Sequence, residues 1–162
     1  MSGERLTELI RDIEYAMFTT VDDDGLLRSR PLATLEVDSD RELCFFTSES
    51  LPKVGEVARE HRVNLAYADP KTQRYVSVSG IARVSRDHER MKRLWRPQYR
   101  AWFPKGLDEP DLVLLCVEVV RAEYWDSPPS TIVHAIGLAK AMITGERYEG
   151  AGEHEKLERR SA

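Results

Sequence analysis

Short segments rich in β-forming residues, separated by tight-turn signals, run through most of the chain. The segment 15–21 is followed by Asp-Asp-Asp-Gly at 22–25, and Asp-Gly is a strong hairpin signal. A second turn signal, Asp-Ser-Asp, occupies 38–40. Strands do not alternate regularly with helices, which disfavours a doubly wound α/β sheet. The pattern predicts about six mostly antiparallel strands, at residues 15–21, 27–37, 42–47, 63–68, 75–85 and 112–124.

Helices are predicted where apolar residues recur at helical spacing. The expected helices cover residues 4–14, 52–60, 87–95 and 133–144, and Pro52 suits the first turn of the second. Gly80, inside a predicted strand, indicates a bulge or a close backbone approach. We therefore expect a mainly β protein, a small β-barrel with helical decorations, as one domain over 1–145. A polar, loosely ordered tail at 146–162 would follow.

Composition narrows the class of protein. The 162 residues are 41% hydrophobic and 32% charged, which argues against a disordered chain. The net charge of −4 disfavours non-specific DNA binding. No apolar run approaches the roughly 20 residues of a membrane-spanning helix, and the N-terminus lacks the pattern of a signal peptide. We expect a cytoplasmic protein without membrane or nucleic-acid partners.

The cysteines and histidines give no metal-binding pattern. Cys44 and Cys116 both lie in apolar, strand-like stretches, so the favoured interpretation is two separate, reduced, buried residues. A single disulfide is the less favoured alternative. The four histidines lie far apart in sequence and form no ligand-spaced pair. No metal site is predicted.

One constellation of residues could bind an anion. Arg30 lies in one predicted strand, Thr47 and Ser48 end another, and Lys53 lies in the first turn of the helix that follows. Hydroxyls, free helix N–H groups and cations together favour a phosphate monoester. The alternative is a capped helix with a solvated lysine and a surface ion pair. Dinucleotide, P-loop, nucleophile-elbow and zinc-protease motifs do not occur in the sequence.

Several stretches resemble a known family in their order and spacing. They are Phe18–Gly25, Ser29–Leu32, Phe45–Ser48 with Lys53, Tyr75–Ala82, Leu94–Pro97, Ala101–Gly106 and Ala122–Asp126. Together they resemble the general stress protein branch of the pyridoxamine 5′-phosphate oxidase-like, FMN-binding split-barrel superfamily. The resemblance spans about residues 10–145. It implies a six-stranded antiparallel split β-barrel that forms a homodimer, with FMN in two clefts between the subunits.

The same resemblance implies a set of cofactor-binding residues. Arg30 and Lys53 would neutralise the FMN phosphate, and Thr47 and Ser48 would donate hydrogen bonds to it. The backbone of 30–33 would run beside the flavin ring. Trp102, with Phe103, would reach the cleft from the partner subunit. The full set is Ser29, Arg30, Leu32, Ala33, Phe46, Thr47, Ser48, Lys53, Tyr75, Trp102 and Trp125.

Two departures from the family pattern limit the activity that is expected. The Arg-x-His motif that follows the C-terminal tryptophan in the oxidases is missing after Trp125, so pyridoxamine phosphate oxidase activity is not expected. Leu51 stands where many relatives have a serine, although Ser50 is adjacent. No dedicated acid or base stands out. The favoured function is therefore flavin-dependent redox chemistry on an unknown substrate.

Alternative functions stay open. The same barrel could take a deazaflavin, or less readily haem, or act as a non-enzymatic binding module in stress. Seven basic residues within 83–100, interleaved with Trp95 and Tyr99, could instead bind single-stranded nucleic acid. A solvated helix face is the more ordinary interpretation of that run. Trp95 itself is expected to pack in the core.

Overall fold

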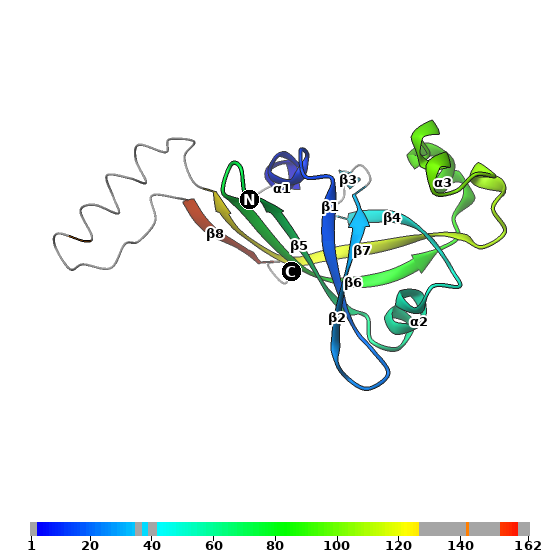
Figure 1. Ribbon diagram of the computed structural model, residues 1–162, viewed down its shortest axis with the longest axis horizontal. Coiled ribbons are helices and arrows are strands. Elements are labelled where there is room, and N and C mark those ends of the chain that lie inside the picture. Colours follow the sequence, from blue (N-terminus) through cyan, green and yellow to red (C-terminus); the bar gives the residue numbers. More distant parts are fainter. Residues whose placement is uncertain (1–2, 35–36, 39–41, 127–141, 143–152, 159–162) are drawn as a thin grey trace.

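Eight strands form one antiparallel sheet in the described part of the chain (Figure 1). The structure is a computed structural model that describes residues 3–34, 37–38, 42–126, 142 and 153–158. The spatial order is β2-β1-β5-β6-β7-β4-β3, and β8 pairs with β7. The strands are β1 (Tyr15–Val21), β2 (Leu27–Ala33), β3 (Val37–Asp38), β4 (Glu42–Ser48), β5 (Arg62–Asp69), β6 (Arg74–Ser85), β7 (Leu112–Asp126) and β8 (Glu153–Glu158).

The six longer strands fall where the sequence predicts them, and the curled, mainly β split barrel is confirmed. The main difference is in the predicted strand 27–37. It divides into β2, which ends at Ala33, and the short β3 at Val37–Asp38. β1 and β2 form the predicted hairpin, in which Tyr15 pairs with Ala33 and Val21 with Leu27.

The helices are short. They are α1 (Gly3–Ile10), α2 (Pro52–Arg59) and α3 (His88–Leu94), and the region between α3 and β7 holds two single 3₁₀ turns, η1 (Pro97–Ala101) and η2 (Gly106–Asp108). In the described residues, no helix is long and apolar enough to cross a membrane. The predicted helix at 133–144 lies outside the described residues, apart from residue 142.

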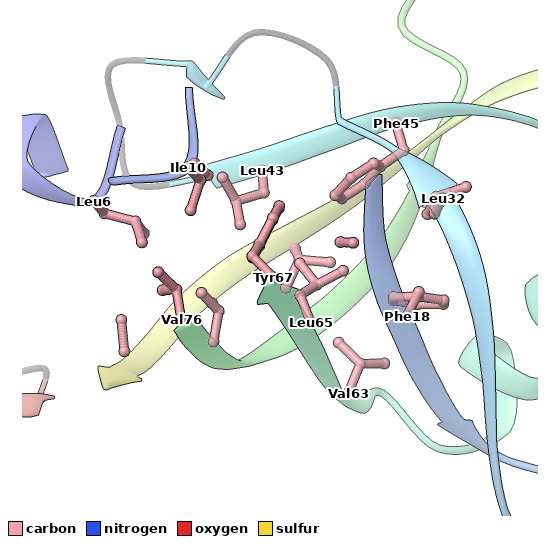
Figure 2. Packing of buried hydrophobic residues seen from close by; sticks show 14 of the residues in the cluster. Leu6, Ile10, Phe18, Leu32, Leu43, Phe45, Val63, Leu65, Tyr67 and Val76 are labelled. Atoms are coloured by element: carbon pink, nitrogen blue, oxygen red, sulfur yellow. The ribbon is translucent and has the colours of Figure 1, made fainter. Parts of the chain in front are cut away.

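The curled sheet encloses the main core. Alternate residues of each strand point inward, as Ala16, Phe18 and Thr20 do on β1. Figure 2 shows Phe18, Leu65 and Tyr67 converging inside the barrel. Side chains of α1 and α2 complete this core. Its largest members are Tyr67, Phe18, Phe45, Leu9, Ile10, Leu43, Leu65, Leu115, Val57, Val76 and Val78.

A second core lies outside the barrel, on the outer face of β4 and β7. Cys44 and Phe46 of β4 and Leu114 and Cys116 of β7 are buried there under Met91 of α3. Leu94, Trp95, Tyr99, Phe103 and Leu107 cover this cluster. β4 is therefore buried on both faces, which explains its unbroken apolar run.

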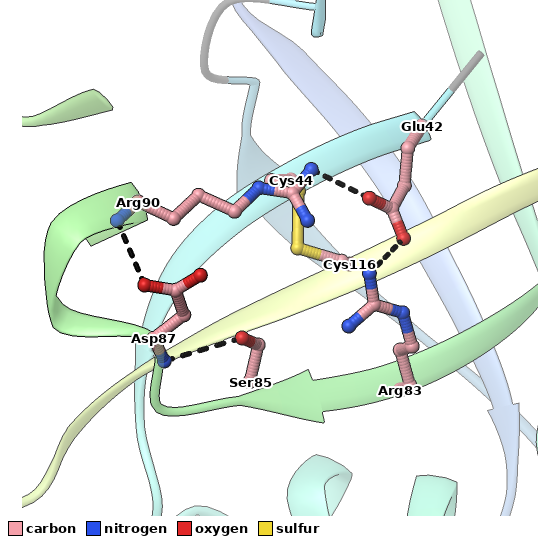
Figure 3. The surroundings of a disulfide bond; sticks show 7 residues. All are labelled: Glu42, Cys44, Arg83, Ser85, Asp87, Arg90 and Cys116. Carbon is pink, nitrogen blue, oxygen red and sulfur yellow. Dashed lines mark hydrogen bonds and ion pairs between the residues drawn. A yellow bond between two sulfur atoms is a disulfide. The ribbon is translucent and has the colours of Figure 1, made fainter. Parts of the chain in front are cut away.

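The prediction of two separate cysteines is wrong. Cys44 and Cys116 form a disulfide between the neighbouring strands β4 and β7, with their Cα atoms 4.1 Å apart (Figure 3). Directly opposed residues of an antiparallel pair come about this close at non-hydrogen-bonded positions. Spacing along the sequence could not predict this pairing, because 72 positions separate the two residues.

The C-terminal segment also differs from the expected loosely ordered tail. β8 pairs antiparallel with residues Arg121–Asp126 of β7. β4 pairs only with Leu112–Glu118 of the same strand. The second half of β7 would otherwise expose a free edge, and unpaired edges attract further strands. β8 satisfies the backbone groups of this edge.

Gly80 marks a bulge and a close backbone approach, as predicted. The register between β6 and β7 shifts between Ser79 and Gly80. A Cβ atom on Gly80 would overlap Cγ1 of Val117 and lie 2.5 Å from the carbonyl oxygen of Glu118.

Gly80→Ala is expected to destabilise the protein by about 1–3 kcal/mol, since overpacking forces the two strands apart. Chemical denaturation measures the effect. Gly55→Ala is the matched control, because a Cβ atom there meets nothing within 4 Å. Alanine at this helical position should stabilise by up to about 1 kcal/mol. Equal effects of the two substitutions would contradict the assigned bulge.

Candidate functional site

The ends of β2 and β4, the start of α2 and the η1 region surround a pocket of about 460 Å³. Its lining includes aromatic rings together with hydroxyls and a lysine. This volume lies within the usual range for small-molecule sites. The lining residues are Tyr15, Pro31, Leu32, Ala33, Phe46, Thr47, Ser48, Leu51, Lys53, Tyr99, Trp102 and Phe103.

The aromatic side of the pocket is built on Phe46. Its ring lies 5.2 Å from that of Trp95, 5.6 Å from Tyr99 and 6.5 Å from Phe103, in edge-to-face or tilted contacts. Such contacts fix ring orientations. Trp95 packs against the outer core and does not line the pocket, as expected. Trp102 is exposed at the rim.

Thr47 carries a buried polar atom without a partner. The residue is only 2% exposed, and its Oγ1 has no hydrogen-bond partner among the described residues. A buried hydroxyl left unpaired costs free energy, and such an atom in a pocket wall suits a polar ligand.

Ser48, by contrast, is already engaged. Its hydroxyl donates to the Asp111 carboxylate and lies 2.8 Å from the Ser50 hydroxyl. The hydrogen bond from Ser48 lowers the pKa of Asp111. Asp111 has no part in the sequence prediction, because only the strand register brings the start of β7 beside the end of β4.

Lys53 is the cation that lines the pocket. It lies in the first turn of α2, which begins at Pro52 and has no side-chain cap. Lys53 makes no hydrogen bond or ion pair with any described residue. Burial lowers its pKa, and the positive charge of Arg30 lowers it further. Of the alternative, a capped helix with a solvated lysine and an arginine in an ion pair, the structure has the ion pair, between Arg30 and Glu56, but neither the side-chain cap nor a fully solvated lysine.

Arg30 lies beside this end of the pocket but points away from it. Its guanidinium donates to Oε2 of Glu56 at 2.7 Å and to Oγ1 of Thr20 at 2.8 Å. Arg28 also reaches Glu56, at 3.5 Å. The buried carboxylate of Glu56 thus joins α2 to β1 and β2. Alternation along β2 already places Arg30 on the inner face, opposite to Pro31.

The predicted cofactor residues divide into two groups. Seven line the pocket: Leu32, Ala33, Phe46, Thr47, Ser48, Lys53 and Trp102. Ser29 is on the outer face, with its hydroxyl 2.7 Å from that of Thr19. Tyr75 and Trp125 pair across β6 and β7, outside the pocket. Trp102 and Phe103 line the pocket of their own chain. That they reach the cleft of a partner subunit stays a prediction.

Tyr15 and Leu51 are lining residues that the sequence prediction omits. The signal for Tyr15 was available, since the hairpin places it directly opposite the predicted residue Ala33.

The basic run 83–100 is partly neutralised by ion pairs within the chain. Glu42 is paired with Arg83 at 2.8 Å and with Arg90 at 2.5 Å (Figure 3). Arg86 pairs with Glu49, and Lys92 with Glu89. Three carboxylates thus pair with four of the seven basic residues, which reduces the positive charge of the run without cancelling it.

Among the described residues, one group has metal-donor atoms close together, namely Glu42, Cys44 and Cys116. Both sulfur atoms are in the disulfide, and two arginines occupy the carboxylate. The group therefore offers no open set of ligands.

A curled antiparallel sheet with an aromatic, cationic pocket at its side defines a ligand-binding split barrel. The model of the family described as "Pyridoxamine 5'-phosphate oxidase like" matches residues 2–149, and the chain belongs to this family. Within it, solved structures of general stress proteins place the chain in the general stress protein branch.

Three relatives illustrate this placement. A protein assigned as general stress protein 26 from Jannaschia sp. CCS1 is 22% identical, with a TM-score of 0.74, over 96% of this chain and 99% of that one. The general stress FMN/FAD binding protein from Xanthomonas citri is 27% identical, with a TM-score of 0.68, over 80% and 92%. Protein bli-3 of Neurospora crassa is 25% identical over 87% of this chain and 72% of its own length.

Thr47→Val is expected to leave the ligand-free protein as stable as the wild type or slightly more stable, because it removes an unpaired buried hydroxyl at nearly constant shape. Urea unfolding tests this. Thr20→Val is the comparison, since its hydroxyl bonds both Glu56 and Arg30. It should cost about 1–3 kcal/mol. A large loss for Thr47→Val would show that its hydroxyl is satisfied within the protein.

Proposed function

We propose that the protein binds FMN in the pocket beside α2 and uses it in redox chemistry. The observation that carries the proposal is the pairing of an aromatic wall with a polar end that holds Lys53 and the unpartnered hydroxyl of Thr47. Flavin mononucleotide has a flat ring system that suits the aromatic wall and a phosphate that suits the polar end. Membership of the family and the flavin-binding relative support the same ligand class.

The charge around α2 suits a phosphate monoester. Two cations, Arg28 and Arg30, contact one carboxylate, Glu56, and a third, Lys53, lies one helical turn before Glu56 on α2. Two positive charges are left unbalanced, which is the charge of a phosphate monoester dianion near neutral pH. Lys53 would contact the phosphate, and Thr47 would donate a hydrogen bond to it.

The lining residues bind and orient a ligand but include no acid–base pair. They contain no histidine, aspartate or glutamate, and Lys53 is their one charged group. A bound flavin would itself supply the hydride or electron transfer. The protein would hold the ring against Phe46, Tyr99 and Trp102 and exclude water from that side. A deazaflavin is the second candidate, because it also needs an aromatic wall and an anion site.

A homodimer accounts for the predicted residues that lie outside the pocket. Tyr75 and Trp125 are exposed by 41% and 42%, and Tyr15, at the pocket edge, by 46%. These aromatic residues belong to an exposed apolar surface on the outer side of the sheet, and such surfaces mark interaction sites. Its members are Tyr15, Met17, Leu27, Tyr75, Ile81, Val120 and Trp125. A second copy covering this surface would bring its own Tyr75 and Trp125 toward the pocket.

Lys53→Ala is expected to weaken FMN binding about tenfold, as loss of a charge-assisted bond to a phosphate does. Riboflavin, which lacks the phosphate, should bind equally to both proteins. Quenching of flavin fluorescence measures both affinities. Lys71→Ala, at an exposed turn, is the matched control and should change neither the affinity for FMN nor that for riboflavin. A wild-type protein that takes up no FMN would refute the proposal, and uptake of a deazaflavin instead would favour the second candidate.

Met17→Glu is expected to convert a dimer into monomers, because it places a charge within the exposed apolar surface. Size-exclusion chromatography with light scattering gives the mass. Arg93→Glu introduces a carboxylate on α3, away from this surface, and should leave the dimer intact. A monomeric wild-type protein would exclude the proposed assembly.

A further inference from the structure

Glu56 enters the functional argument so far only through the charge balance around α2, although it is among the most completely bonded side chains of the described structure. It lies on α2 one turn after Lys53, and its side chain is only 4% exposed. Thr20 donates to its carboxylate at 2.5 Å, Arg30 at 2.7 Å and Arg28 at 3.5 Å.

These contacts close a ring. Arg30 donates one Nη to Glu56 and the other to Thr20, and Thr20 donates in turn to Glu56. Burial alone would raise the pKa of Glu56, but the hydrogen bonds from Thr20 and Arg30 and the nearby positive charges outweigh it and lower the pKa. Glu56 is therefore ionised near neutral pH, and its carboxylate holds the Arg30 guanidinium in the ligand-free protein.

Arg30 nevertheless acts on the pocket. It directly precedes the lining residue Pro31, and its partner Glu56 lies one helical turn after Lys53 on α2. Its positive charge also contributes to the lowered pKa of Lys53. Yet Arg30 does not line the pocket, since its guanidinium is turned toward Glu56. A phosphate at Lys53 and the carboxylate of Glu56 would compete for the same guanidinium.

We propose that Glu56 is an internal counter-ion that competes with the phosphate of the ligand for Arg30, and so limits how tightly the pocket holds phosphorylated flavin. The inference rests on the proposed function. Glu56 is not a catalytic residue and does not line the pocket. It determines the discrimination between phosphorylated and unphosphorylated ligands through Arg30.

The competition predicts that neutralising Glu56 lowers the stability of the empty protein but strengthens the binding of a phosphorylated ligand. Neutralising Glu56 leaves Arg30 buried without its counter-ion, which destabilises the empty protein. A bound phosphate then supplies the missing negative charge and no longer meets a fixed carboxylate. The ligand-free variant should therefore be less stable than the wild type, while binding of a phosphorylated ligand should stabilise the variant more strongly.

The test compares Glu56→Gln with Glu60→Gln by titration with FMN and with riboflavin. Glu60→Gln removes the same charge at the end of α2, where the carboxylate pairs with Arg62 and does not contact Arg30. We expect Glu56→Gln to bind FMN at least fivefold more tightly than wild type and riboflavin within twofold of wild type. Glu60→Gln should stay within twofold for both ligands.

Thermal unfolding provides an independent readout. In Glu56→Gln the midpoint without ligand should fall, and the rise that FMN produces should exceed that of the wild type. Equal or weaker FMN binding by Glu56→Gln, beside a wild-type protein that binds FMN, would overturn the inference and leave the proposed function standing. An equal gain in affinity for riboflavin in Glu56→Gln would also overturn the inference, because riboflavin has no phosphate. Failure of every variant and of the wild type to bind either flavin would overturn both.

Arg28→Gln is a second variant that tests the same competition if Glu56→Gln does not fold. Arg28 is half-exposed, and its loss leaves the Glu56 carboxylate with Arg30 as its one remaining arginine partner. Tighter pairing of Arg30 should weaken FMN binding at least twofold without changing riboflavin binding. Arg62→Gln removes the same charge from the Glu60 pair and should have no effect. Equal affinities of Arg28→Gln and Arg62→Gln for FMN would contradict the proposed competition between Glu56 and the phosphate for Arg30.

Discussion

Strand β4 packs against apolar side chains on both of its faces, and the pocket depends on this arrangement. Leu43 and Phe45 point into the barrel, while Cys44 and Phe46 point into the outer core beneath α3 and η1. A shift of β4 by one residue would move Leu43 and Phe45 into the outer core and Cys44 and Phe46 into the barrel, so neither core would keep its packing. The two cores fix the register of β4. This register places Phe46 among the aromatic residues of the pocket and Thr47 beside it in the pocket lining. The disulfide to β7 adds a covalent constraint on the same register.

The opposite end of the pocket is organised by charge rather than by apolar packing. Glu56 and Arg30 connect α2 to the barrel, and the connection keeps Lys53 at the pocket end of the helix. A buried ion pair of this kind adds little net stability, since desolvation offsets the attraction. The ion pair instead fixes the orientation of α2 and of the Arg30 side chain. The arginine that the sequence assigns to a ligand is bound by the protein itself in the ligand-free state, so the anion site has an internal competitor.

The sequence predicted local structure well and long-range pairing poorly. Turn signals and alternation located the six longer strands, and Gly80 was correctly read as a bulge. The pairing of Cys44 with Cys116, the contact of Asp111 with Ser48 and the pairing of β8 with β7 all depend on strand register between distant segments. Seven of the eleven predicted cofactor residues meet in one pocket, because they lie in adjoining turns and strand ends. Alternation along β2 predicts the inward direction of Arg30, but no motif reveals its partners Thr20 and Glu56.

The pairing of β4 with β7 has a consequence for the order in which the protein is made. Ser48 lies opposite Leu112, and Glu42 lies opposite Glu118, so this ladder joins segments that are synthesised far apart in time. Contacts of such sequence separation form late, because a long loop must close first. The hairpin of β1 and β2 and the β5–β6 pair can form early from local contacts. β4, which carries Phe46, Thr47 and Ser48 to the pocket, gains its long partner only when β7 has emerged from the ribosome, although every lining residue precedes β7 in the chain.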